Sequence, residues 1–169
     1  NKLYIYDKKN TTILKKISIL ILLILFVKET YAQCNGRYEN EIFSSVTKTT
    51  INYSDIYNDN EHTMDVYTPD GDLEVNRPVI LYMHGGSFYA GDKGSTDCVD
   101  FCESMAKRGY VTASLNYRLA TNIVGFLTSN ATQYETVLKA VFDAKSAVRY
   151  FRKDFANGNI FGIDTSTIF

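Results

Sequence analysis

The sequence predicts an α/β fold in which a mixed, mostly parallel sheet is flanked by helices. Residues 46–54 and 62–68 alternate loosely between apolar and polar side chains, as half-buried strands do. Residues 79–83 (VILYM) form a continuous apolar run, which is typical of a strand buried on both faces. A helical pattern over 95–108 separates this run from a further strand at 110–115, and that succession indicates a right-handed parallel crossover. We therefore expect antiparallel edge strands that lead into a parallel centre.

Each of the two helices is predicted from an apolar stripe and a boundary signal. Gly109 is a natural stop for the helix at 95–108, whose stripe has the spacing i, i+3, i+4, i+7 and i+8. The second helix is expected to begin at a capping box, 132–135 (TQYE), and to end at 157–159 (NGN). A fifth strand is expected to begin only at Thr167. The stripe of the first helix comprises Cys98, Phe101, Cys102, Met105 and Ala106, and that of the second Val137, Ala140, Val141, Ala144, Ala147, Val148 and Phe151.

Residues 1–32 are set apart as upstream residues and a signal peptide. Two lysines precede an apolar run of about eleven residues at 17–27, and small residues up to Ala32 supply a cleavage site. A transmembrane anchor is the alternative, but it needs about 20 apolar residues. A lipid-anchored Cys34 is a third possibility, which Gln33 disfavours because that modification needs a small residue before the cysteine. We expect an exported protein, periplasmic or secreted, without a stable membrane span after cleavage.

The mature chain is then divided into an N-terminal segment, 33–44, and a single α/β domain, 45–169. The sequence begins with Asn1 and its first methionine is Met64, so residues 1–12 are interpreted as upstream translated sequence or as a truncated start. A length of 169 residues leaves room for one domain at most. The formal net charge of −1 gives no indication of a nucleic-acid partner or of an anionic membrane surface.

The three cysteines leave two interpretations open. Export permits disulfides, but Cys98 and Cys102 lie four apart on one expected helix, which is poor geometry for a bond between them. Cys34 can pair with either of them, or both helical cysteines can be small buried apolar side chains. A metal site is not expected, because two cysteines without a nearby histidine are an incomplete zinc shell. No cofactor is implied.

The stretch that follows the apolar run at 79–83 carries a family resemblance. Residues 84–88 (HGGSF) resemble the H-G-G-G-type oxyanion loop of α/β-hydrolase esterases and lipases. Residues 110–119 resemble the next strand of that family, and 143–169 resemble the long helix and connector that lead towards its nucleophile. The resemblance covers 45–169 and implies the N-terminal half of a carboxylesterase-like α/β-hydrolase.

The resemblance also assigns roles within this loop. The backbone N–H groups of Gly86 and Ser87 are the expected oxyanion-hole donors, although Ser87 replaces the third glycine of the motif. His84 and Gly85 are expected to support the loop, with His84 acting through a hydrogen bond and not as the catalytic base. The other histidine, His62, is interpreted as a surface or rim residue. Ser87 is not the expected nucleophile.

No G-x-S-x-G motif occurs, so the resemblance places the nucleophile, acid and base beyond residue 169. Asp164 matches a connector position and is not assigned as the acid. We expect a fragment that is inactive by itself, whose full-length form hydrolyses esters with neutral or apolar acyl groups; feruloyl-type esters, acetylated sugars and formamides are all compatible. Since nearly all of the fifth strand is expected to be absent, the edge of strand 79–83 should be unpaired and prone to association. The alternative is a non-catalytic binding protein that retains the hydrolase scaffold.

Overall fold

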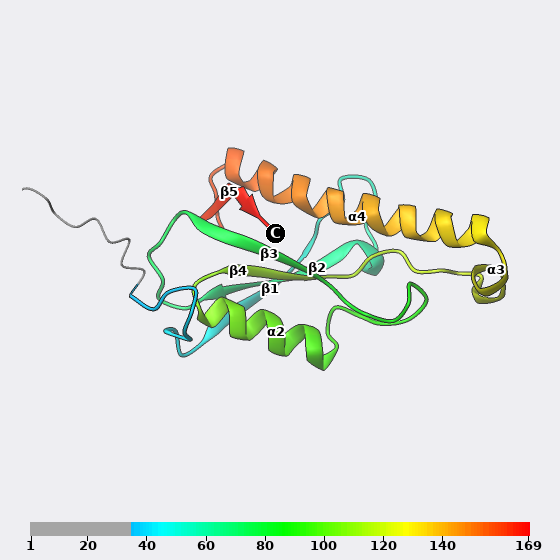
Figure 1. The fold of residues 1–169 in the computed structure, drawn as a ribbon. Coiled ribbons are helices and arrows are strands. Elements are labelled where there is room, and N and C mark those ends of the chain that lie inside the picture. Colours follow the sequence, from blue (N-terminus) through cyan, green and yellow to red (C-terminus); the bar gives the residue numbers. More distant parts are fainter. Residues whose placement is uncertain (1–34) are drawn as a thin grey trace, which may run out of the picture. The chain divides into compact units, whose positions relative to one another are not determined.

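The computed structural model describes residues 35–169, in which five strands form one mixed sheet of order β1-β2-β4-β3-β5 (Figure 1). β1 pairs antiparallel with β2, and β2 antiparallel with β4, whereas β4–β3 and β3–β5 are parallel. Antiparallel edge strands therefore lead into a parallel centre, as expected. The strands are β1 (Val46–Asn52), β2 (Thr63–Pro69), β3 (Arg77–Met83), β4 (Val111–Leu115) and β5 (Ile163–Ile168).

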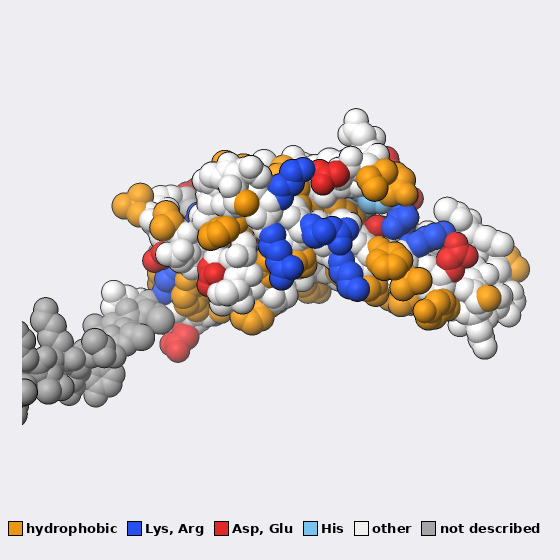
Figure 2. Space-filling view, turned by 90° about the horizontal axis from the view of Figure 1, so that it is seen from above, with side chains coloured by type: hydrophobic (Ala, Val, Ile, Leu, Met, Phe, Trp, Pro, Cys, Tyr) orange, Lys and Arg blue, Asp and Glu red, His pale blue; other side chains and the backbone are white. Residues whose placement is uncertain are grey.

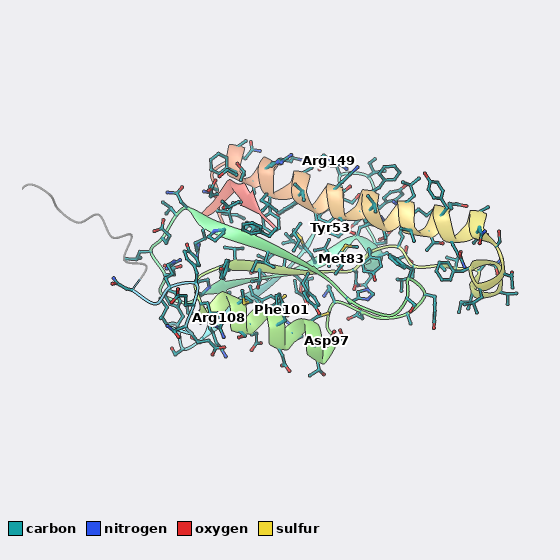
Figure 3. The ribbon with its side chains drawn as sticks, viewed as in Figure 1. Tyr53, Met83, Asp97, Phe101, Arg108 and Arg149 are labelled. Carbon is teal, nitrogen blue, oxygen red and sulfur yellow. The ribbon has the colours of Figure 1, made fainter. Side chains whose placement is uncertain are left out.

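Helices cover both faces of this sheet. The elements are a 3-10 turn η1 (Asn60–His62), α2 (Thr96–Lys107), α3 (Ile123–Thr128) and α4 (Asn130–Ala156). α2 and α4 lie on opposite faces (Figure 1). Cys98 and Cys102 of α2 are fully buried free thiols, which agrees with their interpretation as small core side chains. Phe101 packs its ring 4.7 Å from that of Tyr82, on the side of α2 that faces the sheet (Figure 3).

The start of α4 differs from the expectation. The helix begins at Asn130, and its N-cap is Ser129, whose hydroxyl accepts the N–H of Thr132. The capping box at 132–135 was therefore wrong, because α3 ends just before Ser129 and leaves that residue in an extended conformation suited to an N-cap. Glu135 instead forms an ion pair with Lys139 one turn on, at 2.7 Å.

The buried face of α4 is also rotated from the one expected. Val137 and Val141 are 37% and 41% exposed, and a carboxylate, Asp143, is buried in the face instead. The prediction of this face considered apolar residues alone. It therefore left out a charged residue whose ion-pair partner lies outside the helix. The buried residues of α4 are Thr136, Ala140, Asp143, Ala147 and Phe151.

The fifth strand is longer than expected and pairs with β3. β5 begins at Ile163, four residues before the predicted start, because a tight turn precedes it: the side chain of Asn159 accepts the N–H of Ile163. Arg77 is in register with Ile163, and Phe169 exchanges hydrogen bonds with β3 at Val79 and Leu81. The expectation that the edge of β3 is largely unpaired was therefore wrong, because residues 163–169 pair with it.

The main core lies between the sheet and α4. Its fully buried side chains come from four strands and one helix, so burial of apolar surface fixes the sheet against α4. No helix among residues 35–169 is long and apolar enough to cross a membrane. The predictions of a signal peptide, its cleavage and the pairing of Cys34 fall outside the described residues. The core includes Met64, Val66, Val79, Val111, Ala113, Leu115, Ala147, Phe151 and Ile163.

Candidate active-site loop

The loop that carries the HGGSF motif, residues 84–93, leaves the carboxyl end of β3. Met83 is the last residue of that strand, and Figure 3 places it where the ribbon passes into the loop. The parallel neighbour β4 ends at the same edge of the sheet, with Met83 in register with Leu115. Ligands of open α/β sheets bind outside the carboxyl ends of the strands, so a site is expected at this end of β3 and β4.

The backbone of the loop turns sharply through left-handed conformations. Gly86 has φ 115°, and a Cβ there would lie 2.0 Å from the carbonyl oxygen of Ala90, so only glycine fits. Ser87 and Phe88 have φ 54° and 64°, which is unfavourable for residues with a side chain. The carbonyl of Gly86 accepts the N–H groups of Tyr89 and Ala90, each at 3.1 Å. The loop is thus a tight and strained turn.

Several backbone N–H groups of the loop, those of Gly86 and Ser87 among them, donate no hydrogen bond within the described residues. Gly86 and Ser87 are both exposed, and within residues 35–169 neither of their N–H groups donates a hydrogen bond. Backbone N–H groups in consecutive turn residues form a concave site for an anion or for the oxygen of a polarised carbonyl. The structure therefore places the two predicted donors side by side and unpaired; their part in a reaction stays a prediction.

His84 is buried beneath the loop, with 4% of its surface exposed. Its ring stacks on that of Tyr117, with centroids 4.4 Å apart and planes 17° apart, and its Nδ1 lies 2.7 Å from the carbonyl oxygen of Gly85. A Cβ at Gly91 would lie 2.2 Å from this Nδ1, so the chain closes tightly over the imidazole. His84 is thus bound into the loop through Nδ1, as a supporting residue would be.

An apolar cavity of about 370 Å³ opens between the loop and α4. Ser87 lines it beside the ring of Phe88, while Val137 and Val141 line it from the helix. These two valines, which the sequence placed in the core, border this cavity instead. Burial raises the pKa of Tyr117, which also lines it, so the hydroxyl stays protonated and can donate a hydrogen bond.

His62 lies away from this cavity and is buried, with only 2% exposed. Its prediction as a surface or rim residue was wrong, because the η1 turn folds the imidazole inward beneath the ring of Tyr57, 4.4 Å away. Nδ1 lies 2.6 Å from a carboxylate oxygen of Asp59, and this hydrogen bond holds the pKa of Asp59 below its usual value. Nε2 lies 3.6 Å from Asp143. His62 is a packed structural residue.

The sequence did not predict a partly buried ion pair that lies next to the site. Arg118, just after β4, donates from Nε and Nη2 to the carboxylate of Asp143, and its backbone N–H adds a bond of 2.9 Å. These hydrogen bonds are the main cause that raises the pKa of Arg118. The available signal was an aspartate in the middle of an apolar helix face, which calls for a cationic partner when buried.

Asp164 was assigned to a connector before the fifth strand, which was wrong, because β5 begins at Ile163 and includes it. Its carboxylate accepts the backbone N–H and the hydroxyl of Ser166 near the start of β5, and these bonds hold its pKa below the usual value. In the part of the chain that the structure describes, no three His, Cys, Asp or Glu residues are grouped as metal ligands.

Comparisons with known proteins give a family and a set of similar folds. The BD-FAE family model matches residues 64–169. A search of curated proteins gives no match. A solved bifunctional GH43-CE protein of Bacteroides eggerthii is 25% identical with a TM-score of 0.51, and the match covers 70% of this chain and 14% of that one.

Two further solved structures, both below 25% identity, show similarity of fold. A truncated form of a carbohydrate esterase from gut microbiota is 22% identical with a TM-score of 0.53, over 79% of this chain and 40% of that one. Esterase B from Lactobacillus rhamnosis is 21% identical with a TM-score of 0.52, over 89% and 42%. The chain thus spans less than half the length of each of these proteins.

Proposed function

Because this chain belongs to the BD-FAE family, an α/β-hydrolase family of the esterase type, we propose that it is the N-terminal part of a serine hydrolase that acts on carboxylic esters. One observation carries the proposal: the amides of Gly86 and Ser87 are exposed and unpaired at the carboxyl end of β3. They would bind the oxygen of the ester carbonyl as it becomes negatively charged, and loss of one such donor costs about 3 kcal/mol of transition-state stabilisation.

The direction of β5 supports a nucleophile supplied by sequence after residue 169. Phe169, the residue after β5, exchanges backbone hydrogen bonds with Val79 and Leu81, so the end of β5 lies level with the middle of β3. The two strands run parallel. Each further strand residue would advance about 3.3 Å towards the loop. A strand-to-helix turn a few residues on would therefore present its serine beside the two amides.

The chemistry divides between the two parts of such an enzyme. A serine Oγ from the later sequence attacks the ester carbonyl carbon while a histidine takes its proton; the alcohol then leaves, and water hydrolyses the acyl-enzyme. The present chain contributes the donors and the walls of the apolar cavity, whose side chains favour a neutral or apolar acyl group over a charged one.

Substitutions of Ser87 test this assignment in the protein expressed from the complete reading frame. Ser87→Ala and Ser87→Gly are expected to keep turnover of a p-nitrophenyl ester within a few-fold, because the donor is the backbone N–H. Alanine at the serine of a downstream G-x-S-x-G motif should abolish turnover. Loss of turnover in folded Ser87→Ala, or serine-inhibitor-sensitive turnover by the 169-residue chain alone, would contradict the proposal.

Export belongs to the same proposal and rests on residues 1–32. Expression with the leader should give a protein outside the cytoplasm whose first residue is Gln33. N-terminal sequencing of the exported product measures this, and an intact leader on a cytoplasmic product would exclude cleavage.

A further inference from the structure

We propose that Asn116 and Tyr117 are positioning residues that hold the two ends of the loop 84–93, so that the amides of Gly86 and Ser87 remain presented to a ligand. The inference rests on the proposed function for its catalytic consequence, but the contacts themselves are independent of it. Both residues follow β4 directly and both are buried.

The loop needs external support because its own conformation is unfavourable. Ser87 and Phe88 are both left-handed, and such residues persist only where surrounding structure fixes them. The hydrogen bonds between backbone atoms inside the turn converge on a single atom, the carbonyl oxygen of Gly86. Those bonds alone do not fix the loop relative to the sheet.

Tyr117 fixes the beginning of the loop. Its hydroxyl donates to the backbone carbonyl of His84 at 2.6 Å, and its ring stacks on the imidazole. Its ring also packs edge-on against Phe88, with centroids 6.1 Å apart. One side chain thus contacts the residue before the two glycines and the residue after Ser87.

Asn116 fixes the end of the loop. Its Oδ1 accepts the backbone N–H of Lys93 at 2.7 Å. Its Nδ2 donates to the carbonyl of Asn60 at 3.0 Å and to the carboxylate of Asp92 at 3.3 Å. The side chain therefore joins the last loop residues to the segment before β2, which does not otherwise belong to the site.

The connector that carries these residues is itself anchored. Arg118 binds Asp143 of α4, and the N–H of Ala120 donates to the carbonyl of Phe88 at 2.7 Å, in the middle of the loop. Residues 116–120 thus hold the start, the middle and the end of the loop from one short stretch of backbone. This arrangement holds the loop in place without a hydrogen bond from the amide of Gly86 or Ser87.

Hydrogen exchange in the 169-residue chain tests the contact of Tyr117. Tyr117→Phe keeps the ring and removes only the hydroxyl. The amides of Tyr89 and Ala90, to which Tyr117 makes no hydrogen bond, should then exchange about fivefold faster, the equivalent of one ordinary hydrogen bond. The matched control is Thr112→Val on β4, which removes a buried hydroxyl bonded to the carbonyl of Cys102 on α2. It should leave both loop amides unchanged; equal exchange in wild type and Tyr117→Phe would overturn the inference.

Asn116→Ala is the second variant, and its hydrogen exchange is measured at the same two amides. It removes the bonds that Asn116 makes to Lys93 and Asp92, while Lys93 keeps its contacts with Ser114 and Asp65, and exchange at Tyr89 and Ala90 should again increase about fivefold. Faster exchange confined to Lys93, the amide that Asn116 binds directly, would contradict a role in holding the whole loop.

Kinetics of the protein from the complete reading frame test the catalytic consequence. Tyr117→Phe should lower kcat about tenfold and leave KM within about twofold, since misplaced donors weaken binding of the transition state more than of the substrate. Thr112→Val should leave both constants unchanged. An unchanged kcat beside faster loop exchange would overturn the positioning role. If the wild type hydrolyses no ester, the proposed function fails, while the exchange data still decide whether the loop is held.

Discussion

At the amino ends of the parallel strands, two arginines bind the backbone directly, whereas at the carboxyl ends two backbone amides are left free. Arg77 donates to the carbonyls of Phe161 and Gly162 just before β5, and it begins β3 itself. Arg37 donates to the carbonyl of Gly109 two residues before β4 and binds Asp72 through two hydrogen bonds of 3.0 and 2.6 Å. Asp72 also lies 3.5 Å from Nη1 of Arg77, so these contacts join the starts of all three parallel strands.

The carboxyl ends are held differently. Around the loop 84–93 two neutral side chains, Asn116 and Tyr117, bind backbone atoms on either side of Gly86 and Ser87. Charged groups contribute at the end of the loop, where Lys93 pairs with Asp65 at 2.7 Å, and further out, where Arg118 pairs with Asp143. At the amino ends of the strands the polar side chains fix the chain. At the carboxyl ends they hold a loop in which two amide donors stay available. Variants at the first end should therefore change global stability, and variants at the second should change the loop.

The largest effect is expected from Arg77→Met. The substitution keeps most of the side-chain volume but leaves the carbonyl of Phe161 without its donor and the carbonyl of Gly162 with only the backbone N–H of residue 77, which should lower the free energy of unfolding by about 2–4 kcal/mol. Urea denaturation measures it. Lys153→Met is the control, because Lys153 pairs with Asp55 on the exposed surface and should change stability little. Equal losses in the two variants would remove the contrast between a buried anchor and a surface pair.

A smaller and local effect is expected from Gly86→Ala. The new methyl group would overlap the carbonyl of Ala90 at a left-handed position, so the turn should open at a cost of about 1–3 kcal/mol. Gly85→Ala is a control one residue away, since a Cβ there meets nothing within 4 Å and its φ is not positive. Exchange of the Tyr89 and Ala90 amides should increase in the first variant only. Similar exchange in both would show that the turn does not require glycine at position 86.

The smallest effect is expected from acid titration at the amino-end cluster. Burial raises the pKa of Asp72, but hydrogen bonds from Arg37 and from the Glu74 amide outweigh it and hold the pKa below its usual value. The unfolded-state pKa is about 3.9, so the stabilisation is complete above that value and is lost as the pH falls through the lower folded-state pKa. Urea denaturation between about pH 5 and pH 2 should show wild type approaching Asp72→Asn in stability. A constant difference across that range would contradict the linkage.

Much of the fold could be predicted from local patterns. The apolar run before the HGGSF motif is an inner strand, paired with β4 and β5, and the alternating strand before it is an inner strand too, paired with β1 and β4. Gly109 follows the end of α2 at φ 101°, a conformation that favours glycine. These features depend on residues close together in sequence, which is why sequence periodicity and turn chemistry predict them.

The errors have a common physical cause. Asp143 lies on the buried face of α4 because its partner Arg118 is 25 residues earlier in the chain, and no helical periodicity encodes that distance. His62 is buried because the ring of Tyr57 stacks on it and Asp59 binds its Nδ1, two contacts that the strand pattern at 62–68 does not encode. β5 begins early because Asn159 fixes a tight turn before it.

The sequence by itself determined the order of the strands and of the two long helices, the family resemblance and the identity of the loop with Gly86 and Ser87, but not the short helix α3. Only the tertiary structure decided that their amides are unpaired, that His84 is bound beneath them, and that residues after β4 hold both ends of the loop. The reason is that a motif specifies which backbone conformations are accessible, whereas the contacts that stabilise an unfavourable one come from segments distant in sequence.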